Sequence, residues 1–475
     1  MPLPDGLIAV VKRDCPTCVL IAPVLQEIET KGVPLTVYVQ DDPSFTGASR
    51  IVDDRNLEHS FRLAIEIVPT LIEIVDGHEK QRAVGWLRRE WEAVSGLEAL
   101  GAGLPDFSPG CGSKSVEPGT AERLAVRYGE PKMKARRIEV PPLEQDIELC
   151  YARGWSDGLP VVPPTEERVY GMLQGTTRAP AEILGLMPPN LAPCSIEKVA
   201  INAVLAGCKP EYLPVVIAAV EAALDPAFCL HGLLATTWFS GPMIIVNGPI
   251  RQRIGMNWQG NVLGQGNRAN ATIGRALQLV VRNVGGGKPQ EADQSTFGSP
   301  VKYGFCFAED EHTPWTTLAE DRGLRRDQSS VTLFSADGPL GCIDQKSRDP
   351  ASLLYSLAGS LRGINHIDLA NAADAVVVIG PEHGRVFDEA GWNKAQVLAA
   401  LHERLRICGQ DLGMGTDPST KVLPPAGTDM VSKFRPEGLT LVRAGGQAGL
   451  FSAIIPGWLM KGPLGTDPVC KEIRL

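Results

Sequence analysis

The stretch VVKRDCPTCVLIAPVLQEI, residues 10–28, places two cysteines between a β-rich run and a helical pattern. Residues 7–11 (LIAVV) predict a short buried strand, and residues 16–32 predict a helix that begins on a proline and ends on a glycine. Cys15 directly precedes this helix, and Cys18 follows one turn later on the same side. This spacing suits an exchange between two thiols.

A helix N-terminus favours thiol chemistry at Cys15. Its unpaired backbone N–H groups and the positive end of the helix dipole stabilise a thiolate, which is the nucleophilic form of cysteine. We therefore predict that Cys15 attacks and that Cys18 resolves the resulting mixed disulfide. A zinc site would need four ligands, and no second Cys-x-x-Cys or nearby His pair completes such a set, so we expect no metal. An inert, packed pair of cysteines is the remaining alternative.

The residues around the motif predict a small α/β domain over residues 1–100. Residues 35–40 (LTVYVQ) read as a strand and residues 56–65 (NLEHSFRLAI) as a helix. Residues 70–86 read as a hairpin that turns at Asp76-Gly77.

Three separated features of this domain resemble the thioredoxin superfamily. A Cys-x-x-Cys opens a helix directly after a strand, and Pro23 corresponds to the proline that kinks that helix in the family. Pro69, in IVPTL, precedes a strand where the family has a cis-proline beside the cysteines. The resemblance implies a thioredoxin-like fold, a cis Val68-Pro69 bond and thiol–disulfide exchange in which Pro69 belongs to the catalytic site. It also implies an electron donor of the thioredoxin-reductase type.

Two departures from the family leave the direction of the redox step open. Asp14 stands where family members usually carry a tryptophan, and an acidic neighbour raises a thiol pKa, although Arg13 opposes this effect. The strand before the motif lacks the buried acid that many reductases have there.

Residues 101–130 are rich in Gly, Pro and Ser and have no periodicity, so we predict a linker. Strand and helix patterns alternate through residues 131–475, which predicts a large α/β domain. Two stretches of this domain, residues 199–216 and 265–276, look similar to a bacterial family without an assigned activity. That similarity implies no reaction.

Two pairs of segments indicate an internal duplication of residues 243–341 and 375–449. Residues 244–254 (IIVNGPIRQRI) match residues 376–386 (VVVIGPEHGRV) in a buried strand, Gly-Pro and a later arginine. VTLFSADGPLG, from residue 331, similarly matches LTLVRAGGQAG, from residue 439. The alternative is that strand-to-glycine junctions look alike by chance. Because ligands of α/β sheets bind at the carboxyl ends of strands, we expect a site at the Gly-Pro loops.

Cys208 is the residue we predict as the internal partner of Cys15. It lies between two expected helices beside Lys209, so both charge and helix dipole would favour a thiolate. A small buried hydrophobe in a helix turn is the alternative. Cys342 and Cys111 are further candidates, the latter within the expected linker.

Polar residues in the large domain suggest a binding site for an anion or carboxylate. Asn267, Arg268 and Asn270 precede an expected helix, whose N-terminus could cradle the ligand, or they cap that helix. Arg253 and Arg385 follow the two Gly-Pro turns and could form a carboxylate clamp.

An acid–base role is predicted for Glu382 and His383, which follow a buried strand. Residues 309–312 (EDEH) could bind a hard cation, with a solvated acidic loop as the alternative.

Composition excludes several classes of function. The chain has 475 residues, of which 44% are hydrophobic, and a formal net charge of −9, which argues against nucleic-acid binding. No run approaches 18 apolar residues and the first 14 residues lack a basic start, so we expect a cytoplasmic protein without membrane contact. Eleven dilute cysteines are expected to be mostly free thiols.

These patterns predict a thiol–disulfide redox enzyme whose first domain exchanges electrons with a large domain. The large domain would act on a small polar or anionic substrate, which could contain sulfur, and no organic cofactor is expected. The partners would be this substrate or a thiol client, with a second copy of the chain as a further candidate. The alternatives are a lyase or hydrolase with a regulatory or scaffolding first domain, and a redox-sensing ligand-binding protein.

Overall fold

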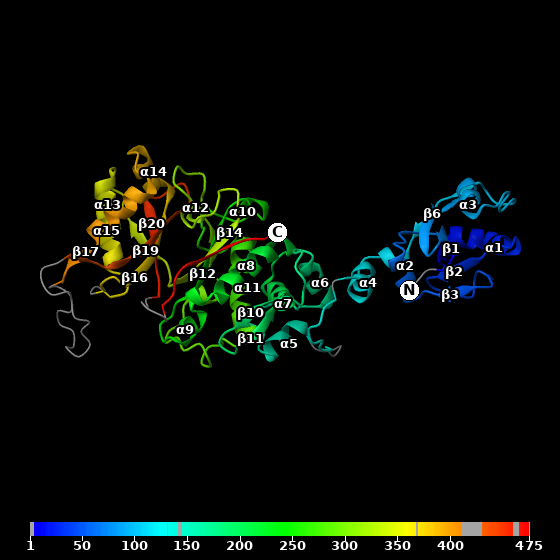
Figure 1. Ribbon diagram of the computed structural model, residues 1–475, viewed down its shortest axis with the longest axis horizontal. Helices are drawn as coiled ribbons and strands as arrows, with labels where there is room; N and C mark the ends of the chain where they lie inside the picture. The colour runs from blue at the N-terminus through cyan, green and yellow to red at the C-terminus, as the bar shows by residue number, and fades with distance from the viewer. Residues whose placement is uncertain are drawn as a thin grey trace. The chain divides into compact units, whose positions relative to one another are not determined.

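The computed structural model describes residues 4–130, 132–140, 145–366, 369–409, 430–458 and 465–474. The chain divides into two compact units, Met1–Lys132 and Met133–Leu475 (Figure 1). Both combine helices and strands, so the α/β class is confirmed. Among the described residues no single helix is long and apolar enough to cross a membrane. One bent pair, Pro210–Leu224 with Pro226–Ala235, passes only when its helices are counted together.

The first unit has, within residues 4–130, a five-stranded sheet of order β3-β2-β1-β5-β6. β1 is parallel to β2 and antiparallel to β5, and β2 is parallel to β3. The elements are β1 (Gly6–Val11), α1 (Pro16–Thr30), β2 (Leu35–Val39), β3 (Ile51–Asp53), α2 (Glu58–Arg62), β5 (Thr70–Val75), β6 (His78–Val84) and α3 (Arg88–Ser95). Asp76 and Gly77 turn the β5–β6 hairpin with positive φ values of 52° and 74°, as predicted.

The sheet and α1 share the core of this unit. Alternate residues of β1, such as Ile8 and Val10, pack in one hydrophobic cluster with Ile21, Leu25 and Ile28 of α1. Because β1 is buried on both faces, its sequence is a continuous apolar run. The same packing fixes the end of β1 and the start of α1, and so positions the cysteine pair.

Residues 101–130 carry secondary structure, unlike the linker that their composition predicts. β8 (Phe107–Ser108) pairs with β7 (Trp86–Leu87), and β9 (Cys111–Gly112) pairs with β4 (Ile67–Val68). The 3-10 helix η1 (Lys114–Val116) and α4 (Thr120–Tyr128) follow. Two-residue ladders are made by backbone groups alone and leave no hydrophobic periodicity, so the sequence pattern did not reveal them. The first unit therefore extends past residue 100.

The described part of the second unit contains two four-stranded sheets, of order β13-β12-β14-β21 and β15-β20-β16-β19. The first has β12 (Gly241–Asn247), β13 (Cys306–Ala308), β14 (Ser330–Ala336) and β21 (Val469–Glu472). The second has β15 (Leu340–Ile343), β16 (Ala373–Ile379), β19 (Phe434–Arg443) and β20 (Phe451–Pro456).

Helices cover the outer face of each sheet, which gives an α/β/β/α order of layers (Figure 1). Ile244 and Val246 of β12 pack on the first helical layer, whereas Met243 and Ile245 pack on the other sheet. The first layer contains α7 (Ile196–Ala206), α8 (Leu213–Leu224) and α11 (Arg268–Asn283), and the last contains α13 (Pro350–Arg362), α14 (Pro381–Glu389) and α15 (Lys394–Arg404).

Shorter elements occur elsewhere in the described part of the second unit. They are α5 (Asp146–Ala152), α6 (Glu166–Leu173), β10 (Ile183–Met187), β11 (Ala192–Ser195), η2 (Pro210–Tyr212), η3 (Pro226–Phe228), α9 (Leu230–Ala235), α10 (Ile250–Arg253), η4 (Pro300–Lys302), α12 (Leu318–Asp321), β17 (Arg406–Cys408) and β18 (Met430–Ser432).

The two sheets have the same arrangement of strand directions around β12 and β16. Each of these strands has one parallel neighbour, β13 or β19, and one antiparallel neighbour, β14 or β20. Each is followed by Gly-Pro and a helix, so the match of residues 244–254 with 376–386 lies on corresponding strands.

The second sequence match pairs strands that do not correspond. VTLFSADGPLG contains β14, which is antiparallel to β12, whereas LTLVRAGGQAG contains β19, which is parallel to β16. The sequence of a buried strand and its glycine turn does not indicate whether the neighbouring strand is parallel or antiparallel. This part of the predicted duplication is therefore wrong. Residues 410–429 of the second repeat lie outside the described residues.

Candidate functional site

Cys15 caps the N-terminus of α1, as the sequence predicts. Its φ is −148°, and its Sγ accepts a hydrogen bond from the backbone N–H of Cys18 at 3.3 Å. The Cys15 thiol in turn lies 3.6 Å from the carbonyl oxygen of Val68, to which it donates. The Val68-Pro69 peptide bond is cis, which confirms that prediction. The Cys15 sulfur thus lies between one N–H donor and the carbonyl group that precedes the cis-proline.

Cys18 is fully buried, and Cys15 is only 1% exposed. Burial is the largest cause of a strongly raised Cys18 pKa, and a hydrogen bond and charge from Cys15 add to it. Cys18 is therefore a protonated thiol at neutral pH. The assignment of Cys15 as the attacking thiol and Cys18 as the resolving one stays a prediction.

A third thiol, that of Cys111, lies beside Cys15. In the β4–β9 pair Cys111 stands opposite Val68, the residue whose carbonyl accepts from Cys15. A side-chain hydrogen bond with Cys15 is the largest cause of a raised Cys111 pKa, whereas the charge of Lys12 lowers this pKa. Cys111 is half-buried, while the other two thiols are buried. The sequence offered Cys111 only as one of three partners for Cys15.

Residues 107–113, which we call the Cys111 segment, lie over the start of α1. The Thr17 hydroxyl donates to the carbonyl oxygen of Pro109 at 2.6 Å and lies 2.8 Å from the Ser108 hydroxyl. With the β7–β8 and β4–β9 pairs, these contacts fix the segment across the cysteine motif.

The loop before Cys15 is held by acidic residues. The backbone N–H groups of Arg13 and Asp14 donate to Asp41, and the Arg13 guanidinium pairs with Asp42. Asp14 raises the pKa of Cys111, in the direction expected of an acidic neighbour.

Cys208 does not have the environment that its sequence position predicts. It is 7% exposed and donates to the carbonyl oxygen of Thr272 at 3.4 Å. Burial raises its pKa to about 12, so desolvation outweighs any help from charge or dipole. The Lys209 ammonium pairs with Glu211 at 3.7 Å. Cys208 is a packed hydrophobe, the alternative that sequence left open.

Cys342 is likewise buried, and its Sγ accepts from the Ser360 hydroxyl at 3.3 Å. Burial is the main cause of its raised pKa. Among the three partners that the sequence offered, Cys111 alone lies in the unit that holds Cys15 and is half-exposed.

His383 does not project into a cleft. It is 1% exposed, and its ring nitrogens lie 2.8 Å from the Ser452 hydroxyl and 3.0 Å from the carbonyl oxygen of Asp344. Both nitrogens are therefore engaged in the core, and the proton-transfer role is wrong. The neighbouring Glu382 pairs with Arg385 at 3.2 Å.

The Asn-rich loop caps a helix, the alternative that the sequence left open. Asn267 accepts from the Asn270 N–H at 3.0 Å as the N-cap of α11. Asn270 exchanges two hydrogen bonds with the backbone of Asn257, and Arg268 donates to the carbonyl oxygen of Gly207 at 2.9 Å. These side chains hold backbone groups of the fold.

Arg253 and Arg385 line two different cavities, so they do not form the predicted clamp. The duplicated pattern places each arginine after a Gly-Pro turn, but the two turns lie at different sheets.

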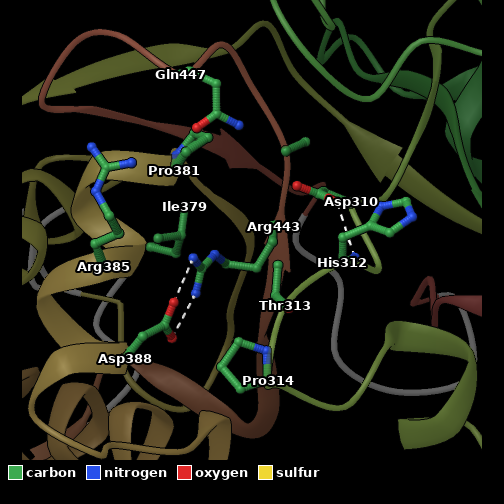
Figure 2. Close-up of a pocket in the computed structure, with 11 residues that line it drawn as sticks. Asp310, His312, Thr313, Pro314, Ile379, Pro381, Arg385, Asp388, Arg443 and Gln447 are labelled. Atoms are coloured by element: carbon green, nitrogen blue, oxygen red, sulfur yellow. Dashed lines mark hydrogen bonds and ion pairs between the residues drawn. The ribbon is translucent and has the colours of Figure 1, made fainter.

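A cavity of about 170 Å³ lies at the carboxyl ends of β16 and β19 (Figure 2). Arg443 lines the cavity and donates to Asp388 at 3.0 and 3.2 Å, with its guanidinium 4.9 Å from the Trp315 ring. A Cβ on Gly384 would overlap this guanidinium, so glycine is required for the close approach. Arg385 lies at the rim, with a half-exposed side chain.

The far side of this cavity carries Asp310 and His312, which pair at 3.1 Å (Figure 2). The cavity lies at strand ends after a Gly-Pro turn, which is where the sequence predicts a ligand site. Arg443 and Asp388 were missed, because only the folded sheet brings the end of β19 to α14.

Glu309 and Glu311 are buried and do not form a solvated loop. The Asn247 amide donates to both carboxylates, at 2.6 and 3.1 Å, and Arg251 pairs with Glu311 at 2.9 Å. Within the described ranges no group of three or more His, Cys, Asp and Glu residues is arranged to hold a metal. The carboxylates have protein partners.

Burial raises the pKa of Glu309 to about 7, so this residue makes stability depend on pH. From pH 4.5 to 7 the folded protein keeps a proton that the unfolded chain has released, so its contribution to stability falls as pH rises. In the wild type this residue lowers the free energy of unfolding as the pH rises from 5 to 7.5. In Glu309→Gln the decrease over this range should be smaller by about 2 kcal/mol. Urea unfolding at both pH values measures this.

Part of the slope should remain in this variant, because burial also raises the pKa of Asp374 to about 6. A Glu309→Gln protein with the full wild-type slope would contradict the assignment.

No protein-family model matches the chain, and no curated protein has significant similarity to it. Function therefore has to be inferred from the residues of the thiol cluster and of the cavity.

Proposed function

We propose that the first unit is a thioredoxin-like domain that exchanges thiols and disulfides, with Cys15 as its nucleophile. The observation that carries this proposal is the environment of the Cys15 sulfur. It caps α1, accepts the Cys18 N–H and lies against the carbonyl before a cis-proline. Hydrogen bonds from backbone N–H groups and the helix dipole favour the thiolate that attacks a disulfide.

The sheet order and the thiol pair support the same proposal. The β3-β2-β1-β5-β6 sheet places Cys15 at the carboxyl end of its central strand β1. Cys18 lies one turn further into α1, within reach of a mixed disulfide on Cys15. Pro69 shapes this site and does not exchange protons or electrons. A client disulfide and an external dithiol donor complete the cycle.

The test is catalysed reduction of a protein disulfide by the full chain. Reduction of insulin by dithiothreitol releases an insoluble chain, so turbidity reports the rate. We expect the protein to shorten the lag before turbidity in proportion to its concentration. A lag that is the same with and without protein would contradict the proposal.

For the second unit we propose a binding site for a small anion at the cavity between Arg385 and His312. Arg385 is the exposed cation at its rim, and its i,i+3 pair with Glu382 is of a surface kind that a ligand can displace. Arg443 is paired with Asp388, so it would contribute mainly its positive electrostatic potential and the shape of the cavity wall.

A thermal-shift experiment with inorganic phosphate and with oxalate tests this site. An anion at 100 times its dissociation constant stabilises a protein by about 2.7 kcal/mol, which raises the melting temperature. Arg385→Gln should abolish the shift, whereas Arg253→Gln, at the other cavity, should retain it. Equal shifts in the two variants, or none in the wild type, would refute the site.

A further inference from the structure

The Cys111 segment is attached to the cysteine motif at three places that do not involve sulfur. β8 pairs with β7, β9 pairs with β4, and the Thr17 hydroxyl donates to Pro109. The segment is therefore docked while all three thiols are free, as they are in this structure. No disulfide is needed to bring it there.

Val68 is the residue that brings Cys111 and Cys15 together. Its carbonyl oxygen accepts from the Cys15 thiol at 3.6 Å, and Cys111 is its partner across the antiparallel β4–β9 pair. The Cys15 side chain lies near enough to Cys111 to be the largest cause of its raised pKa. The register therefore places the Cys111 backbone directly beside the residue whose carbonyl group contacts the Cys15 sulfur.

We propose that Cys111 is a third redox-active thiol, which attacks mixed disulfides on Cys15 and competes with Cys18 for this step. This inference rests on the proposed function, which itself needs only Cys15 as nucleophile. Residues 107–113 would then cover the cysteine motif and also supply a reactive thiol.

The exchange balances with a client disulfide as the oxidant. The Cys15 thiolate attacks one client sulfur, an S–S bond forms to Cys15, and the other client sulfur leaves as a thiolate that takes up a proton. Cys111 then loses its proton and attacks the Cys15 sulfur. The Cys15–Cys111 bond forms, and the second client sulfur leaves and is protonated. The client gains two electrons, and an external dithiol later reduces the new disulfide.

Exposure favours Cys111 over Cys18 as the resolving thiol. Cys18 is fully buried in the first turn of α1, whereas Cys111 is half-buried. Deprotonation therefore costs less at Cys111, which also lies near the charge of Lys12. Both resolving routes start from the same mixed disulfide, so their ratio is a measurable property of the protein.

The sequence supplies a direct readout of this ratio. Trypsin releases Cys15 and Cys18 together in residues 14–31, and Cys111 in residues 90–114. A Cys15–Cys18 disulfide therefore stays within one peptide, whereas a Cys15–Cys111 disulfide links two. Cys18→Ala is preferred to Cys18→Ser, because a serine hydroxyl in this fully buried position could not hydrogen-bond to water and would destabilise the fold.

The experiment treats the reduced full chain with oxidised glutathione, blocks free thiols with iodoacetamide and maps tryptic peptides without reduction. In Cys18→Ala we expect residues 14–31 linked to 90–114 and little glutathione on Cys15. In Cys18→Ala/Cys111→Ser glutathione should remain on Cys15. The wild type should also contain some of the linked peptides, which is a second measurement should Cys18→Ala fold poorly.

Two results separate the failure of this inference from that of the proposed function. If Cys18→Ala keeps as much glutathione on Cys15 as the double variant and the wild type lacks the linked peptides, the role of Cys111 is refuted while Cys15 remains the nucleophile. If the double variant has no glutathione on Cys15, both proposals are refuted.

Discussion

Replacing Cys15 by serine is expected to lower the rate of disulfide reduction to that of dithiothreitol alone. The serine hydroxyl can still accept the Cys18 N–H, so the cap of α1 and the fold should be retained. What is lost is the sulfur that forms the mixed disulfide, and no other thiol occupies this cap. Circular dichroism of Cys15→Ser checks the fold, and the insulin turbidity rate measures the loss.

Cys470→Ser is the control for this experiment. Cys470 is a half-buried thiol of β21 in the second unit, so its replacement removes one cysteine without touching α1. We expect the wild-type rate from this variant. If Cys15→Ser retained the wild-type rate, or if Cys470→Ser lost it, Cys15 would not be the nucleophile.

The second large effect is expected for stability, at the buried pair of Arg251 and Glu311. Both side chains are less than a tenth exposed, and the Arg251 guanidinium lies 4.9 Å from the Trp258 ring. Glu311→Gln removes the charge but keeps the shape, and leaves a buried guanidinium without its carboxylate. Loss of one partner of a buried ion pair costs about 3–5 kcal/mol. Urea unfolding at pH 7.5 measures this loss.

Glu403→Gln is the matched control, because Glu403 forms a surface i,i+3 pair with Arg406. Surface pairs contribute about 0–1 kcal/mol, so this variant should unfold at nearly the wild-type urea concentration. Similar midpoints for Glu311→Gln and Glu403→Gln would show that the buried pair does not hold the carboxyl ends of β12 and β13 together.

Local patterns predicted most elements that are fixed by nearby residues. The strand before Cys15, the helix that begins at Pro16 and the Asp76-Gly77 turn are each determined within a few residues. β15 and β21 were not predicted, because short edge strands follow from pairing with a distant neighbour. Cys111 was assigned to a linker for the same reason, since its position depends on pairing with Val68.

The candidate site was less predictable than the fold, because burial decides the chemistry of an ionisable side chain. His383 and Cys208 have sequence neighbours that suit function, but both are buried with partners in the core. Arg443 and Asp388 lie 55 residues apart and meet only after β19 has paired with β16. Cys15 was predictable because its helix cap and its nucleophilic position are the same local feature.

The most direct test of Cys15 as the nucleophile is mass spectrometry of a trapped mixed disulfide. Cys18→Ala/Cys111→Ser lacks both neighbouring thiols and should accumulate one disulfide-bound client in residues 14–31 after incubation with a disulfide-containing peptide. The adduct should disappear on addition of dithiothreitol and should be absent when Cys15→Ser is added to the double variant. An adduct distributed over other cysteines, with residues 14–31 unmodified, would contradict the role of Cys15.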